Sequence, residues 1–183
     1  LTATSEHAHD EPDHPHARAA PGATRGFASE TDAPEEQRAQ QILGAAPTRS
    51  RVIANGIDLK RFAGLAPAAD DARPTMALIG RVVPIKDVKT FVRAMKTVVS
   101  RFPQAEGWIA GPEDEDRAYA LECRSMAVSL GIENQVRFLG FQKIDELMPK
   151  LGLVVLSSIS EALPLVLLEG FAAGVPAVAT DVG

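Results

Sequence analysis

The sequence predicts a parallel, doubly wound α/β sheet, and three observations support this prediction. Short apolar runs rich in β-branched residues recur between residues 75 and 179, as in TMALIG and LVVL. Longer stretches with apolar residues at helical spacing separate these runs. Most of the strand-like runs are continuously apolar rather than alternating, as expected for parallel strands with both faces covered. Together these features indicate successive βαβ units.

Each strand of this sheet is expected at a short apolar run bounded by a loop or a helix signal. The five runs are residues 75–80, 107–110, 136–139, 153–156 and 177–179. An earlier run, residues 51–54, is expected to be a strand that ends in an Asn55-Gly56 turn, where glycine supplies a positive φ.

Helices are expected between the strands. Residues 87–102 show apolar side chains at helical spacing up to Phe102, and Pro103 ends the stretch. A second helix is expected at residues 117–130, followed by Gly131 in the C′ position. Shorter helices are expected at residues 34–42, at 59–62 with Asp58 as the cap, at 145–151 and at 164–173.

The composition restricts the class of protein. The 183 residues are 45% apolar and 23% charged, which is typical of a globular domain. No run approaches the ~18 uncharged apolar residues of a membrane span. Cys123 is the only cysteine, so no intrachain disulfide can form, which is compatible with a reducing compartment. The absence of a basic stripe argues against nucleic acid as a partner.

The N-terminal segment differs from the rest. Residues 1–48 have eight acidic and three basic residues, whereas residues 49–183 have 16 of each. Because residues 1–34 have almost no large apolar side chains, we expect them to be a disordered or non-homologous tail. All four histidines lie in this tail and could bind a metal, but a solvated tail without a preformed site is the preferred interpretation. The chain begins at Leu1 and stops after a strand-like run, so we expect it to be part of a longer protein.

The loop after the first expected strand contains two cations, Arg81 and Lys86, between Gly80 and Asp87. In a doubly wound sheet, ligands bind at the carboxyl ends of the strands, and helix N-termini favour anions. A cation just before a helix opposes that local preference, and phosphate binding would explain it. Two surface cations on a loop remain the alternative, since neither the dinucleotide nor the Walker fingerprint is present.

Four consecutive acidic residues, 113–116, precede the second long helix. Compensation of the helix dipole and solubility explain them. A metal site is the sharper alternative, but adjacent acids on one loop rarely all face one ion.

The segment SEALPLVLLEG contains two carboxylates, Glu161 and Glu169, among apolar residues. Pro164 suits the first turn of a helix, which places Glu161 in the loop after a strand and Glu169 in the second turn. Both can then point toward one crevice above the sheet, where carboxylates suit sugar or ribose hydroxyls. Alternatively, Glu161 is solvated and Glu169 pairs with a lysine or arginine.

Several segments, taken in order, resemble the retaining glycosyltransferases of family 4. Glu161 and Glu169 are spaced as in the E-x7-E motif of that family, and GRVVPIK resembles its G-R-x4-K diphosphate-binding segment. VIANGIDLKRF resembles the segment that leads into the family's C-terminal domain. GRVVPIKDVKTF, GPEDED, VRFLGF and AAGVPAVATDVG also resemble the PelF subgroup, which acts in Pel exopolysaccharide synthesis.

The resemblance implies that residues 35–183 are a truncated C-terminal, donor-binding Rossmann-like domain of the GT-B fold. It implies that Arg81 and Lys86 hold the diphosphate of the donor, that Glu169 binds the ribose hydroxyls, and that Glu161 lies beside the donor sugar. Glu161, Arg81 and Lys86 are the residues it assigns to catalysis.

Further donor contacts are implied by the same resemblance. Gly140 and Phe141 would lie near the uracil. Ala162, Leu163, Pro164 and Leu165 would complete the set of donor-binding residues. Leu163 stands where the subgroup is expected to have a polar residue.

The implied donor is a UDP-sugar, with UDP-glucose expected, and the implied reaction needs no metal and no other cofactor. The implied partners are a glycan acceptor, bound through an N-terminal domain that this chain lacks, and a Pel synthesis complex at the membrane. The implied location is the cytoplasm, and the chain by itself is expected to be inactive. The alternative is a non-catalytic nucleotide-sugar-binding or interaction module. A sugar-nucleotide epimerase of the same fold would fit the layout but not the spaced glutamates together with GRVVPIK.

Overall fold

The computed structural model describes Gly44, residues 55–65 and residues 74–182 of the chain. The chain divides into two units, Leu1–Val52 and Ile53–Gly183, and the fold below is that of the second. The expected tail at residues 1–34, the helix at 34–42 and the strand at 51–54 lie outside the described residues.

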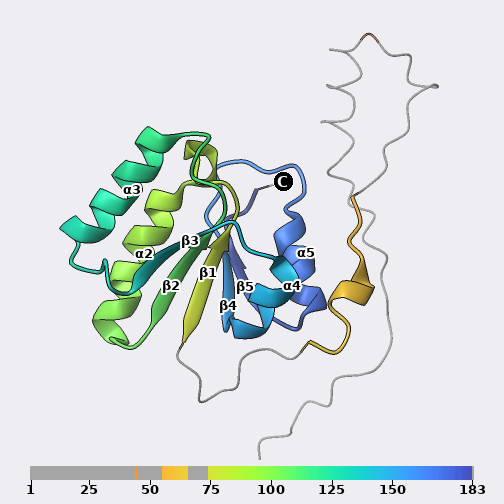
Figure 1. The fold of residues 1–183 in the computed structure, drawn as a ribbon. Coiled ribbons are helices and arrows are strands. Elements are labelled where there is room, and N and C mark those ends of the chain that lie inside the picture. The colour runs from red at the N-terminus through yellow and green to blue at the C-terminus, as the bar shows by residue number, and fades with distance from the viewer. Residues whose placement is uncertain (1–43, 45–54, 66–73, 183) are drawn as a thin grey trace, which may run out of the picture. The chain divides into compact units, whose positions relative to one another are not determined.

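Five parallel strands form one sheet in the order β3-β2-β1-β4-β5, which confirms the predicted fold class (Figure 1). The register along β1 and β2 runs from Thr75 opposite Glu106 to Ile79 opposite Ala110. The strands are β1 (Thr75–Ile79), β2 (Glu106–Ala110), β3 (Val136–Gly140), β4 (Leu153–Leu156) and β5 (Ala177–Ala179).

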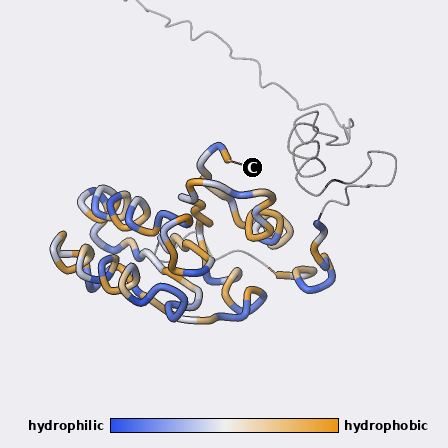
Figure 2. Tube along the Cα trace, turned by 90° about the horizontal axis from the view of Figure 1, so that it is seen from above, coloured by the Kyte–Doolittle hydropathy of each residue, from blue (hydrophilic) through white to orange (hydrophobic). Residues whose placement is uncertain are grey.

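Helices cover both faces of this sheet (Figure 1). The long helices α2 (Val88–Arg101) and α3 (Arg117–Ser129) lie on one face, and α4 (Ile144–Leu147) and α5 (Leu165–Ala172) lie on the other. Two separate apolar clusters form accordingly, one under α2 and α3 and one under α4 and α5. Along the helices, apolar and polar positions alternate in Figure 2, as expected of helices with one face on a sheet.

Several helix boundaries follow from local side-chain chemistry. The carboxylate of Asp87 accepts a hydrogen bond from the Thr90 amide at 3.2 Å and caps α2. Asp58 caps the short 3-10 helix Leu59–Arg61 in the same way, as predicted. Gly131 follows α3 with a φ of 65°, which agrees with the predicted C′ position.

Three details differ from the sequence-based expectations. Phe102 lies at the end of α2 with 47% of its surface exposed, because the helix ends at Arg101 and its apolar stripe ends with it. The helix expected at residues 145–151 divides into α4 and the 3-10 helix Met148–Lys150, in which proline occupies the first turn. Pro164 is the N-cap of α5 and not part of the helix.

The strand order places a topological switch point between β1 and β4, because β2 lies on one side of β1 and β4 on the other. Ligands of open α/β sheets bind in the crevice at such a point. The loops that follow β1 and β4 are joined there by a hydrogen bond from the Ile159 amide to the Ile85 carbonyl at 2.8 Å. Among the described residues, no helix combines the length and apolarity needed to cross a membrane.

Candidate functional site

The loop after β1 holds Lys86 in a fixed backbone conformation. Lys86 ends the 3-10 helix Pro84–Lys86, and the next residue, Asp87, has a φ of 41°. No other non-glycine residue in the described part of the chain has a positive φ. The Ser157 hydroxyl, which follows β4, donates to the carbonyl oxygens of Lys86 and Asp87 at 3.1 and 3.0 Å. The two loops therefore hold the strained turn together.

Lys86 forms an ion pair with Glu161 at the carboxyl ends of β1 and β4. The Lys86 Nζ lies 2.5 Å from Glu161 Oε1, and the Ser158 hydroxyl donates to the same oxygen at 2.5 Å. Only 21% of the Lys86 side chain and 13% of the Glu161 side chain are exposed. The alternative that Glu161 is solvated is therefore wrong.

The pKa of Glu161 reflects opposing effects. Burial raises it, but the hydrogen bonds from Lys86 and Ser158, together with the charges of Lys86 and Arg81, outweigh burial. The pKa therefore lies below its ordinary value, and the carboxylate stays ionised at neutral pH.

Hydroxyl groups around this pair were missed by sequence reasoning. Ser157 and Ser158 are buried, and the Thr180 hydroxyl donates to the Ser158 carbonyl at 2.7 Å. The signal was present as two serines directly after the apolar run LVVL, at the end of a strand where functional groups gather.

Arg81 lies in the same loop but forms a different ion pair. Its Nη1 is 2.6 and 2.7 Å from the two carboxylate oxygens of Glu115, which precedes α3. About half of each side chain is exposed, 52% for Arg81 and 51% for Glu115. The sequence did not indicate this pairing, because the two residues are 34 positions apart.

The acidic loop after β2 divides its carboxylates among separate partners. Glu113 binds Arg124 through two hydrogen bonds of 2.9 Å, Glu115 binds Arg81, and Asp116 caps α3 at the Tyr119 amide. Within the described ranges, no group of three or more His, Cys, Asp or Glu residues could hold a metal ion. The metal alternative for this loop therefore has no support in its geometry.

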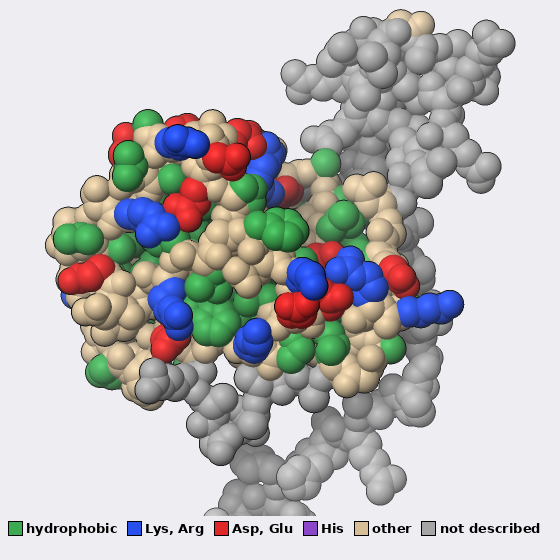
Figure 3. All heavy atoms as spheres, in the orientation of Figure 1, with side chains coloured by type: hydrophobic (Ala, Val, Ile, Leu, Met, Phe, Trp, Pro, Cys, Tyr) green, Lys and Arg blue, Asp and Glu red, His purple; other side chains and the backbone are tan. Residues whose placement is uncertain are grey.

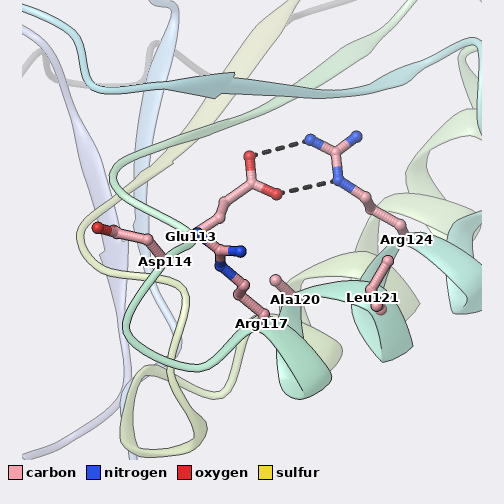
Figure 4. Close-up of a pocket in the computed structure, with 6 residues that line it drawn as sticks. All are labelled: Glu113, Asp114, Arg117, Ala120, Leu121 and Arg124. Carbon is pink, nitrogen blue, oxygen red and sulfur yellow. Dashed lines mark hydrogen bonds and ion pairs between the residues drawn. The ribbon is translucent and has the colours of Figure 1, made fainter.

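A groove of about 360 Å³ lies beside this loop at the start of α3 (Figure 4). Arg124 and Glu113 face each other across it, and the side chain of Arg117 lies near them. None of the residues expected to bind a donor lines the groove. Its lining residues are Glu113, Asp114, Arg117, Ala120, Leu121 and Arg124.

Glu169 differs from Glu161 in its surroundings. Burial raises its pKa above the ordinary value, and the charge of Arg61 offsets only part of this effect. Within residues 55–65 and 74–182, no hydrogen bond or ion pair of the Glu169 side chain is found, and Arg61 itself pairs with Asp145 at 3.5 Å. The alternative that Glu169 pairs with a lysine or arginine is not supported there.

The remaining expected residues lie at the same edge of the sheet. Gly140 ends β3 with a φ of 64°, and its carbonyl accepts a hydrogen bond from the Gly111 amide at 2.8 Å. Phe141 follows with 79% of its surface exposed. The segment between Glu161 and α5 is mostly exposed and consists of Ala162, Leu163, Pro164 and then Leu165 as the first helical residue.

On the face shown in Figure 3, acidic and basic side chains are interleaved rather than gathered by sign. At the switch point, Arg81 and Lys86 lie on one loop, and each is paired with a carboxylate.

Comparison with known proteins identifies the family. Residues 66–183, well over half of the chain, match the model of the family "Glycosyl transferases group 1". This chain belongs to that family.

Curated relatives of the chain agree with this assignment. A D-inositol 3-phosphate glycosyltransferase of Rhodococcus erythropolis is 33% identical over 172 residues, which cover 87% of this chain and 38% of the relative. An exopolysaccharide phosphotransferase of Streptomyces coelicolor is 34% identical over 152 residues, which cover 80% of this chain and 15% of that protein. The chain thus spans less than half the length of these relatives.

Solved structures show the GT-B type of fold. HepE of Anabaena in complex with UDP-glucose is 24% identical, with a TM-score of 0.68 over 80% of this chain and 43% of that chain. Sucrose-phosphate synthase of Thermosynechococcus elongatus is 25% identical, with a TM-score of 0.64 over 82% of this chain and 39% of that chain. The five-stranded domain therefore corresponds to less than half of such a glycosyltransferase.

Proposed function

We propose that this chain is the donor-binding domain of a retaining family 4 glycosyltransferase that uses a UDP-sugar, with UDP-glucose as the donor. The main support is the meeting of Lys86 and Glu161 at the switch point of the sheet, where Ser158 also reaches the carboxylate. The structural neighbour HepE was solved with UDP and with UDP-glucose, which supports the choice of donor.

In this proposal, Arg81 and Lys86 bind the diphosphate, and Glu169 accepts hydrogen bonds from the ribose hydroxyls. Glu169 suits that role because its half-buried carboxylate has no ion pair within the described residues. Gly140 and Phe141 lie next to the uracil, and residues 162–165 line the donor.

The chemistry follows from the charges. Negative charge develops on the departing UDP, and the two cations stabilise it where it forms. Glu161 holds Lys86 in place for this task and lies beside the sugar. A metal ion is not needed in this scheme, since Arg81 and Lys86 supply the positive charge.

The acceptor and the biological role are inferred from the resemblance and from the relatives. The resemblance to the PelF subgroup favours a glycan acceptor, synthesis of Pel exopolysaccharide in the cytoplasm, and association with a membrane complex of that synthesis. The relatives named D-inositol 3-phosphate glycosyltransferase favour an inositol phosphate acceptor instead. The two acceptors are distinguished by offering each, with UDP-glucose, to the enzyme that contains this chain joined to an acceptor domain.

We also propose that the domain arrangement is a tail at residues 1–34 followed by a partial donor-binding domain at residues 35–183. The chain covers 38% of its Rhodococcus relative, so acceptor binding is assigned to a further domain. The chain alone should then bind the donor without transferring sugar. Glucosyl transfer by the chain alone would contradict this part of the proposal.

The test of donor binding is a UDP titration of the 183-residue chain by calorimetry. Lys86→Ala and Glu169→Ala should each weaken binding by about 10- to 100-fold, the effect expected for loss of a hydrogen bond to a charged group. Lys96→Ala, which removes an exposed cation of α2 outside the site, serves as the matched control and should bind as wild type does. Absence of UDP binding by the folded wild-type chain would refute the proposal and favour a non-catalytic module.

A further inference from the structure

The carboxylate of Glu115 forms an ion pair with the guanidinium of Arg81, one of the two cations assigned above to the diphosphate. Arg81 Nη1 contacts both oxygens of this carboxylate, at 2.6 and 2.7 Å. Glu115 lies in the loop between β2 and α3 and belongs to none of the segments assigned to the donor. An internal carboxylate is thus paired with a cation that the proposed function assigns to the diphosphate.

The backbone of the two loops builds this contact. The Gly80 amide donates to the Ala110 carbonyl, and the Val82 amide donates to the Pro112 carbonyl, both at 2.9 Å. A Cβ on Gly111 would lie 1.9 Å from the Gly80 carbonyl oxygen, so only glycine permits this approach. The residues on both sides of Arg81, Gly80 and Val82, are thus hydrogen-bonded to the end of β2 and to the loop that follows it. These bonds hold the loop that contains Arg81 beside the loop that contains Glu115.

Two of the other acids of the loop, Glu113 and Asp116, have partners of their own. Glu113 is held by Arg124 through two hydrogen bonds, and Asp116 is held as the cap of α3. Among the acids of this loop, Glu115 is the one that pairs with Arg81.

The resulting row of charges is neutral. Glu115 pairs with Arg81, the charge of Arg81 lowers the pKa of Glu161, and Glu161 pairs with Lys86. The pair of Arg81 and Glu115, called the outer pair below, is about half exposed. The pair of Lys86 and Glu161, called the inner pair, is largely buried. Exposed ion pairs contribute little and exchange partners readily, so the outer pair is the one that an incoming anion can open.

We propose that Glu115 sets the affinity of the donor site by competing with the diphosphate for Arg81. In the free protein its carboxylate neutralises the guanidinium, and a nucleoside diphosphate replaces it, since guanidinium binds carboxylate and phosphate in similar geometry. Glu115 is then a residue that tunes affinity and not a catalytic residue. This inference rests on the proposed function.

The test is a calorimetric UDP titration of the 183-residue chain at fixed ionic strength, comparing wild type with Glu115→Gln. Removing the competing charge should tighten UDP binding about two- to fivefold, the range given by exposed ion pairs. Asp114→Asn removes the same charge one position away and should change affinity less, because screened charges act weakly at a distance. In an Arg81→Gln background, Glu115→Gln should give no gain.

The outcomes distinguish competition by Glu115 from two other roles of its charge. Weaker UDP binding by Glu115→Gln would mean that Glu115 orients Arg81 for the ligand, and equal gains in Glu115→Gln and Asp114→Asn would mean a general charge effect. Either result overturns the competition while leaving the proposed function intact. Absence of UDP binding in wild type and in Glu115→Gln would overturn both. Thermal unfolding of each variant checks that the fold is retained.

Discussion

Two ion pairs on the loop after β1 differ in surroundings although their cations are five positions apart. Lys86 and Glu161 are largely buried, share a hydroxyl partner and join two loops through Ser157. Arg81 and Glu115 are half exposed, and in the described part of the chain no other ion pair of either residue is found. Burial strengthens an ion pair and makes a lone partner costly, whereas exposure makes the same pair weak. We therefore expect the pair of Lys86 and Glu161 to contribute more to the stability of the fold than the exposed pair of Arg81 and Glu115, which can exchange partners.

The largest loss of stability is expected where the backbone of Gly111 contacts that of Gly80, next to the outer pair. Gly111→Ala would place a Cβ 1.9 Å from the Gly80 carbonyl oxygen, a clash that no side-chain movement can relieve. We expect a loss of about 3 kcal/mol in the free energy of unfolding, measured by urea titration.

Gly152→Ala is the matched control for this change. Its Cβ would lie 3.6 Å from the Thr75 carbonyl oxygen, an ordinary contact, so the loss should stay within about 1 kcal/mol. Equal losses in the two variants would show that the loops after β1 and β2 are not rigidly joined, and the outer pair would then be flexible in its backbone as well.

The second expectation compares the two cations directly. Lys86→Met leaves Glu161 without its cation in a largely buried place, and we expect a loss of about 2 kcal/mol in the free energy of unfolding. Arg81→Gln opens only the exposed pair and should lose less than about 1 kcal/mol. The measurement is urea unfolding at pH 7, and similar losses for both variants would remove the distinction between the pairs.

The inner pair should also make the free energy of unfolding depend on pH. The pKa of Glu161 in the folded protein lies below its ordinary value of 4.5, so the folded state binds its proton less tightly than the unfolded state. The resulting stabilisation is present above about pH 4.5 and is lost as the pH falls through the folded-state pKa.

Glu161→Gln removes this contribution. The difference in unfolding free energy between wild type and the variant should therefore shrink as the pH is lowered from roughly 7 to 3. A difference that stays constant over this range would mean that the Lys86 pair does not stabilise the ionised carboxylate.

The smallest change in stability is expected at Glu169, whose pKa is shifted in the opposite direction to that of Glu161. Burial raises its pKa, so its contribution to stability is present below the unfolded-state pKa and lost as the pH rises through the folded-state value. Glu169→Gln should therefore raise the unfolding free energy at pH 7, by roughly 0.5 kcal/mol or less. A clear decrease in urea unfolding experiments would indicate that the carboxylate has a stabilising partner.

The sequence by itself determined the sheet and its helices, because periodicity and caps are local. The apolar runs, the Asp58 cap and Gly131 all lie where they were predicted. From the sequence, Arg81 and Lys86 were expected in the loop after one strand and Glu161 in the loop after another, and the resemblance to family 4 glycosyltransferases assigned the three to one donor site.

Only the tertiary structure decided which charges meet. Glu115 reaches Arg81 and Ser157 reaches the Lys86 carbonyl across 34 and 71 positions of sequence, and no local pattern encodes such distances. The opposite pKa shifts of Glu161 and Glu169 were likewise unpredictable, because two glutamates in one motif differ only in the burial and partners that the fold gives them.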